Sequence, residues 1–202
     1  VFARHAFGHF AEDFVDRKDP RAAGQPAPTE QATTYAFVLD HPVRGRILID
    51  SGVSEALMPK LTPIMRGALE QLEVRITQPT AQWQQGQPPP RAVFLTHIHL
   101  DHVGGLHDLP ASTPVYLGRG EARHPSPTDE LLGYPIDTSL TGKGPLREWR
   151  FTPDPDGLFD GVIDIFGDGS IWAISVPGHS AGSVAYLVNA VDGPKLVIGD
   201  AI

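Results

Sequence analysis

A short apolar run that leads directly into a histidine-rich segment constrains this sequence more than any other feature. The run, AVFL at residues 92–95, is typical of a strand buried on both faces of a sheet. The segment that follows, THIHLDHVGG, places four metal-binding residue types within six positions: His97, His99, Asp101 and His102. Ligand sites in open α/β sheets lie beyond the carboxyl ends of the strands. The sequence therefore predicts a layered α/β domain with a polar site at the end of this strand.

Histidine and aspartate in an HxHxDH pattern are good ligands for Zn, Mn or Fe. The intervening Ile98 and Leu100 point the other way and can anchor the segment in apolar packing. Two later strands are each followed by one more candidate ligand, His179 in VPGHSAG and Asp200 in VIGDA. A solvated histidine-rich loop would not predict these additional residues at strand ends. We therefore expect a metal site.

Other polar residues near these motifs receive different interpretations. Asp50, in ILIDSG, also ends a strand; we interpret it as a carboxylate that organises a loop or orients a ligand, with direct metal ligation as the alternative. His107 and His124 are interpreted as ordinary surface histidines. Gly104 and Gly105 are expected to let the chain turn closely under the metals into a helix.

Composition narrows the class of function. The 202 residues suit one domain, and 41% hydrophobic with 20% charged residues is ordinary for a globular protein. The absence of cysteine excludes disulfides, thiolate zinc sites and cysteine nucleophiles. A formal charge of −8 argues against nucleic-acid or membrane partners. We expect a soluble protein with a small-molecule substrate; its compartment stays open, with the cytoplasm favoured slightly over export.

Further patterns indicate how the strands and helices alternate. Residues 33–39 and 46–50 read as a hairpin, and LTPIMRGALEQL reads as a helix with Thr62 as N-cap, Pro63 in its first turn and an apolar face that includes Ile64. A strand is expected at 114–117, and further hairpins are expected within 162–176 and 183–200. Hairpins and strand–helix units together predict mixed sheets.

Two segments outside this pattern receive their own predictions. Phe7, Phe10 and Phe14 have roughly helical spacing, which predicts a short amphipathic helix on an N-terminal arm over residues 1–32. The arm is expected to pack against the domain or against a second subunit of a homodimer, and closure over an acyl chain is the alternative. The long insertion at about 119–158 is expected to shape or cover a site.

Four motifs in order, ILIDSG, THIHLDHVGG, PGHSAGS and IGDA, resemble the metallo-β-lactamase fold superfamily over roughly residues 33–202. The resemblance implies an αββα sandwich, in which two mixed β-sheets are flanked by helices and the metals lie at one edge between the sheets. The expected domain organisation is the arm at 1–32 and this domain at 33–202. Superfamily members usually carry one more histidine ligand well beyond the bridging aspartate, so we expect the C-terminal part of the domain to be missing from this chain.

The same resemblance implies a ligand set for two divalent ions, with zinc as the first choice and Mn, Fe or Co as alternatives. The first ion would be bound by His97, His99 and His179. The second would be bound by Asp101 and His102, and Asp200 would bridge the pair. The sequence shown contains no seventh ligand of this kind.

The reaction that follows is hydrolysis of a small-molecule ester-type bond by a hydroxide that the two metals activate. Asp101 is predicted to be catalytic as well as a ligand, because it can orient the hydroxide and pass its proton to the leaving group. The motif wording is most similar to acyl-homoserine-lactone lactonases. The alternatives are a glyoxalase II-like thioesterase, a β-lactamase-like amide hydrolase and a metal-binding protein without turnover. No substrate-binding residue is predicted.

Overall fold

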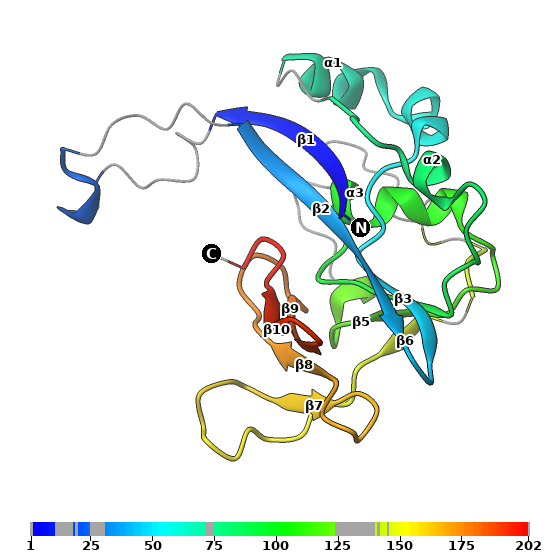
Figure 1. The fold of residues 1–202 in the computed structure, drawn as a ribbon. Helices are drawn as coiled ribbons and strands as arrows, with labels where there is room; N and C mark the ends of the chain where they lie inside the picture. Colours follow the sequence, from blue (N-terminus) through cyan, green and yellow to red (C-terminus); the bar gives the residue numbers. More distant parts are fainter. Residues whose placement is uncertain are drawn as a thin grey trace.

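The computed structural model describes residues 2–10, 18, 20–24, 31–71, 75–123, 140, 142–144 and 146–201. Two β-sheets and a group of short helices make up this part of the chain (Figure 1). The first sheet has the order β1 (Phe2–Phe10), β2 (Gln31–His41), β3 (Gly45–Ile49), β4 (Ala92–Phe94), β5 (Val115–Leu117), β6 (Leu146–Glu148). The second has the order β10 (Gly193–Val197), β9 (Val184–Ala190), β8 (Ile171–Ser175), β7 (Val162–Asp164).

The first sheet is mixed, and its centre is the apolar strand predicted from the sequence. Strands β1, β2 and β3 are antiparallel, whereas β3 to β6 run parallel to one another. The predicted hairpin is confirmed by the pairing of Phe37 with Ile49 and of His41 with Gly45. All three residues of β4 are buried, as expected for a strand covered on both faces. The second sheet is antiparallel through its described strands, and it contains both predicted C-terminal hairpins.

The described helices are α1 (Pro63–Gln71), α2 (Thr80–Gln84) and α3 (Leu100–Val103), with 3-10 turns η2 (Pro20–Ala22), η3 (Glu55–Lys60), η4 (Gly104–Asp108) and η5 (Glu121–Arg123). Among them, α2, α3 and η4 pack against one face of the first sheet (Figure 1). None of the described helices has the length and apolar character that crossing a bilayer requires.

Helix α1 begins where the sequence predicts. The Met65 amide donates to Thr62 Oγ1 at 3.2 Å, which is the expected N-terminal capping contact. Met65 and Leu69 are buried against η3 and α3. Ile64, however, is 68% exposed, so its predicted place on the buried apolar face of this helix is wrong. At 3.6 residues per turn, Ile64 lies about 100° around the helix axis from Met65, outside the face that Met65 and Leu69 share.

The main core lies between the two sheets and ends directly beneath the polar site. Phe94 of β4 packs against Tyr186 of β9 at 5.9 Å between ring centroids. The buried Tyr186 hydroxyl accepts a hydrogen bond from Trp149 Nε1 at 3.0 Å and donates to the Leu95 carbonyl at 2.8 Å. Because Leu95 precedes the histidine-rich segment by one residue, this contact couples the second sheet to the start of the site.

The N-terminal segment corrects the sequence prediction. Phe2–Phe10 forms strand β1 instead of an amphipathic helix, and it pairs with β2 from Phe2 opposite Phe37 to Phe10 opposite Gln31. A short isolated helix is marginal in water, and Gly8 lowers its propensity further. Pairing with the open edge of β2 satisfies the backbone groups instead. Phe14 lies outside the described residues.

The insertion at 119–158 contributes to the sheet itself. Its described ends contain η5 and strand β6, which extends the parallel part of the first sheet. Residues 124–139, 141 and 145 lie outside the described part of the chain, and His124 is among them. That the insertion covers the site therefore stays a prediction, as does the division into an arm and a domain.

Candidate metal centre

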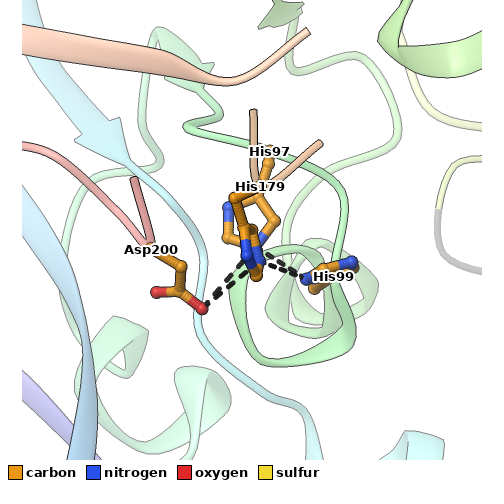
Figure 2. Close-up of side chains that lie close together, drawn as sticks. All are labelled: His97, His99, His179 and Asp200. Atoms are coloured by element: carbon orange, nitrogen blue, oxygen red, sulfur yellow. Dashed lines mark hydrogen bonds and ion pairs between the residues drawn. The ribbon is translucent and has the colours of Figure 1, made fainter. Parts of the chain in front are cut away.

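The predicted ligands meet beyond the carboxyl ends of strands from both sheets. Four of them follow β4, His179 lies in the loop between β8 and β9, and Asp200 follows β10. Their ligand atoms form two groups, each with all atoms within 4.8 Å of one another. We call them the histidine group (His97, His99 and His179, with Asp200) and the aspartate group (Asp101 and His102, with Asp200). Figure 2 shows the members of the histidine group pointing toward one another.

The histidine group has the spacing of a metal coordination shell. His99 Nδ1 lies 3.0 Å from His97 Nε2 and 2.9 Å from His179 Nε2. Asp200 Oδ2 lies 3.9 Å from His97 Nε2 and 3.7 Å from His179 Nε2 (Figure 2). Ligand atoms about 2.0–2.2 Å from a tetrahedral zinc ion lie roughly 3.3–3.6 Å from one another. The observed separations bracket this value.

The aspartate group shares Asp200 with its neighbour through the other carboxylate oxygen. His102 Nε2 lies 3.4 Å from Asp200 Oδ1 and 3.3 Å from Asp101 Oδ2. One oxygen of Asp200 therefore faces the histidine group and the other faces the aspartate group. Asp200 is thus placed so that it could contribute to both groups.

Close backbone packing explains why the histidine-rich segment is followed by glycine. Asp101 and His102 lie in the short helix α3, whose end is joined to β3 by a hydrogen bond from the Ser51 amide to the His102 carbonyl at 2.7 Å. A Cβ atom on Gly105 would lie 1.9 Å from the Ser51 carbonyl oxygen. Only glycine fits this approach, and the close turn under the site depends on it.

Asp50 orients His102 and enters neither ligand group. It is 1% exposed, and its carboxylate accepts hydrogen bonds from the Thr96 amide at 2.7 Å and from His102 Nδ1 at 2.8 Å. Its φ of 57° is the left-handed conformation, which aspartate tolerates better than most residues. The bond to Nδ1 leaves His102 Nε2 facing Asp101 and Asp200 with its lone pair.

Burial keeps two members of the histidine group neutral. Desolvation, assisted by the nearby His102 and His99, holds the pKa of His97 far below its usual range. Burial and the neighbouring His99 also lower the pKa of His179, although that side chain is 31% exposed. Neutral imidazole is the form that binds metal ions, so both side chains are ready to act as ligands without losing a proton.

The aspartate group instead concentrates negative charge. Burial raises the pKa of Asp101, but the neighbouring His102 outweighs this and lowers it below the usual range. Burial lowers the pKa of His102, but the carboxylates of Asp101 and Asp50 outweigh it and raise that pKa well above its usual range. The carboxylates therefore stabilise a positive charge at His102. A divalent ion bound at Nε2 would provide this charge in place of a proton on that nitrogen.

The donor set fits divalent ions in both groups. Within the described part of the chain, the buried Nε2 of His102 makes no hydrogen bond, although carboxylate oxygens surround it. The histidine group likewise turns ring nitrogens toward one another. Imidazole and carboxylate ligands without thiolate suit Zn, Mn, Fe or Co.

Sequence reasoning missed side chains that support the ligands, among them Thr34 and Glu121. Thr34 Oγ1 on β2 donates to Asp101 Oδ2 at 2.7 Å. Glu121, buried in η5, accepts hydrogen bonds from the segments that carry His97, His99 and His179. Thr34 has no motif that could reveal it. Glu121 follows the strand predicted at 114–117, so the rule that ligand sites lie beyond strand ends could have pointed to it.

Two other histidines lie apart from both groups. His107 Nε2 is 2.9 Å from Lys60 Nζ, and His41 Nδ1 accepts hydrogen bonds from the backbone of the turn between β2 and β3. Neither belongs to a ligand group among the described residues, which for His107 agrees with its interpretation from the sequence.

A family comparison decides among the folds that could carry such a site. The model of the Metallo-beta-lactamase superfamily matches residues 30–201. The chain belongs to this superfamily. The resemblance stated from the four motifs is thereby confirmed, and superfamily membership implies divalent metal ions, which the two ligand groups fit.

The chain aligns with only part of the length of its curated relatives. The chain is 34% identical over 117 residues to "Probable metallo-hydrolase YqgX" of Bacillus subtilis (strain 168), covering 56% of this chain and 50% of the relative. It is 28% identical over 180 residues to "N-acyl homoserine lactonase AttM" of Azorhizobium caulinodans, covering 82% of this chain and 63% of the relative. The chain therefore spans between half and two thirds of the length of these relatives.

A solved structure supports the predicted α/β fold with two β-sheets, whereas the missing C-terminal part of the domain stays a prediction. "Crystal Structure of Quorum-Quenching N-Acyl Homoserine Lactone Lactonase" aligns with a TM-score of 0.60, and the alignment covers 96% of this chain and 70% of that one. Sequence identity in the alignment is 16%, so this similarity shows the fold alone.

Proposed function

We propose that this protein is a metal-dependent hydrolase that holds two divalent ions and cleaves an ester-type bond in a small molecule. The observation that carries the proposal is the position of Asp200, whose two oxygens face separate ligand groups. His97, His99 and His179 would hold one ion, Asp101 and His102 the other, and Asp200 both. Zinc is the first choice of metal, because tetrahedral sites with imidazole and carboxylate ligands suit it.

When bound, two such ions would lower the pKa of a water molecule toward neutrality and polarise the bond that is attacked. The protein's own contribution is to hold the reacting groups in place. Thr34 fixes the Asp101 carboxylate beside His102 through its 2.7 Å hydrogen bond. Asp101, kept ionised by His102, is the proposed group that accepts a proton and passes it to the leaving group.

A substrate can reach the site from the side of His179 and Asp200, whose side chains are 31% and 35% exposed. Beside the aspartate group lies a cavity of about 180 Å³ between β2 and the end of β10. Its lining combines Thr34 and His102 with apolar side chains such as Leu196. Polar groups at the metals and apolar walls beside them suit a small molecule that has a hydrolysable polar bond and an apolar part.

A lactone is the first candidate substrate. The relative from Azorhizobium caulinodans is named an N-acyl homoserine lactonase, and the fold aligns with a lactonase of the same class. The motif wording in THIHLDHVGG and PGHSAGS supports the same choice. Thioesters and amides are the alternative substrates that the test below distinguishes from lactones.

The test uses the full-length protein loaded with zinc, manganese or cobalt. A panel of acyl-homoserine lactones, a thioester, a cephalosporin and a phosphodiester is assayed before and after chelation. We expect lactone hydrolysis that is lost to chelator and restored by added metal. His107→Ala, which changes a histidine outside both ligand groups, is the matched control and should behave as wild type.

Two outcomes contradict the proposal at different levels. Thioester turnover without lactone turnover would reject the lactone and retain the metal-dependent hydrolase. Tightly bound metal with no turnover of any substrate in the panel would reject the hydrolase in favour of a metal-binding protein.

A further inference from the structure

We propose that Glu121 is a positioning residue that holds the two chain segments of the histidine group at a fixed separation. The inference rests on the proposed function, since it concerns how the chain prepares this group for an ion. It adds a residue that lies in neither ligand group and that no sequence motif singled out.

Glu121 links the two segments through both oxygens of one carboxylate. Oε1 accepts a hydrogen bond from the Ile98 amide at 3.1 Å. Oε2 accepts from the Gly182 amide at 2.6 Å and from Ser180 Oγ at 2.9 Å. Ile98 stands between His97 and His99, and Ser180 directly follows His179. A single side chain therefore spans the two segments that supply all three histidines.

Close packing brings the carboxylate within reach of both segments. A Cβ atom on Gly118, at the end of β5, would lie 1.8 Å from the Gly182 carbonyl oxygen. A Cβ atom on Gly182 would lie 2.8 Å from Glu121 Cβ. The chain after β5 and the segment after His179 thus approach so closely that both positions require glycine. This approach places Glu121 between the ligand segments.

The character of the donors explains why this residue is a carboxylate. Glu121 is 1% exposed, and a buried carboxylate is costly unless hydrogen bonds satisfy it. Its described hydrogen bonds come from two backbone N–H groups and one hydroxyl, on both oxygens. An ionised carboxylate only accepts, whereas the amide of glutamine would turn an NH2 group toward one of these donors. Glutamine would therefore keep the volume and break part of the link.

Among the residues that the structure describes, the hydrogen bonds of Glu121 go to neighbours of the three histidines in the chain. None of these bonds goes to Asp101 or His102, which are supported by Thr34 and Asp50. A change at Glu121 should therefore weaken one ion and spare the other. A contribution to folding alone does not predict this asymmetry.

The experiment compares wild type with Glu121→Gln in the full-length protein. Chelator competition measures the affinities of the two zinc ions, and the absorption spectrum of the cobalt-loaded protein reports the geometry of each site. We expect the affinity at the histidine group to fall about 10- to 100-fold, the range for residues that orient metal ligands. The affinity at the aspartate group should stay within about threefold of wild type, and the cobalt bands of the histidine group should shift.

Two further variants keep the test decisive if Glu121→Gln folds poorly. Ser180→Ala removes one donor to Oε2 and leaves the carboxylate in place, so it should cause a smaller loss at the same ion. Glu70→Gln makes the same chemical change at an exposed position of α1 and should change neither affinity.

The outcomes separate this inference from the proposed function. If wild type binds no divalent ion, the proposed function fails, and this inference fails with it. If wild type binds two ions, and Glu121→Gln binds both with wild-type affinity and unchanged cobalt bands, only the role of Glu121 is overturned. Equal weakening of both ions would also overturn it, because that result points to a general loss of structure.

Discussion

The two ligand groups share Asp200 but are built in different ways. In the aspartate group, Asp101 and His102 are consecutive residues of α3, and His102 is 2% exposed. In the histidine group, His99 and His179 are 80 residues apart in the chain, and His179 is 31% exposed. The aspartate group is thus organised locally by one short helix, whereas the histidine group depends on the convergence of two sheets.

Each group is supported by a different buried carboxylate outside the ligand set. Asp50 orients His102, and Glu121 links the segments around His97 and His179. Both are 1% exposed. Asp50 binds a ligand side chain directly and also holds the Thr96 amide, whereas Glu121 acts only through residues that adjoin the ligands in the chain.

Removal of the shared ligand should have the largest effect. Asp200→Ala deletes the carboxylate that faces both groups, so both ions should bind more weakly. We expect hydrolysis to fall by more than about 100-fold, the upper end for residues that only support a ligand. Metal content and turnover are measured on the same preparation. Weakening of only one ion would contradict the shared role of Asp200.

Loss of an exposed histidine should separate the groups. His179→Ala removes one ligand of the histidine group, and the aspartate group keeps Asp101 and His102. Elemental analysis after dialysis should find about one ion per chain, while wild type retains two. Because His179 is 31% exposed, thermal unfolding of the metal-free protein should change little. Retention of both ions at wild-type affinity would show that His179 is not a ligand.

Asp50→Asn is the counterpart of the change at Glu121. Asparagine keeps the size of the side chain and accepts a φ of 57°. However, it has one acceptor oxygen in place of two, so it cannot accept from both the Thr96 amide and His102 Nδ1 as the carboxylate does. We expect about 10- to 100-fold weaker binding at the aspartate group and a smaller loss at the histidine group, because Asp50 also holds Thr96, the residue before His97. Chelator competition on both variants should show the larger loss at the aspartate group for Asp50→Asn and at the histidine group for Glu121→Gln. If both variants weaken the same ion most, the assignment of one carboxylate to each group is wrong.

Thr34→Val should have the smallest effect of this series. Valine matches the shape of threonine but cannot donate to Asp101 Oδ2. We expect turnover to fall by about tenfold, with metal content unchanged, because the carboxylate keeps its place near His102 but loses one restraint. Steady-state kinetics should show the loss mainly in kcat. Unchanged kinetics would remove Thr34 from the account.

Sequence patterns predicted the locally determined parts of the molecule well. The hairpin of β2 and β3, the buried β4 and the start of α1 all follow from short-range patterns and capping. The six predicted ligands come together because each follows a strand, and strand ends meet at one edge of the two sheets. Their assembly could thus be predicted before any contact was known.

Contacts between distant residues could not be predicted in this way. β1 forms a strand because the edge of β2 offers it partners, which local helical spacing does not reveal. Thr34 lies 67 residues from Asp101 in the chain, and Glu121 lies 23 residues from Ile98, with no motif joining either pair. The position of Glu121 after a predicted strand could have drawn attention to it, but only the folded chain shows the partners of either residue.

The central claim is that two ions share Asp200, and anomalous scattering from crystals of the zinc-loaded, full-length protein tests it most directly. We predict two zinc peaks. One should lie among His97, His99 and His179, the other should lie beside Asp101 and His102, and Asp200 should contact both. A single peak, or a pair of peaks with Asp200 bound to only one of them, would contradict the account.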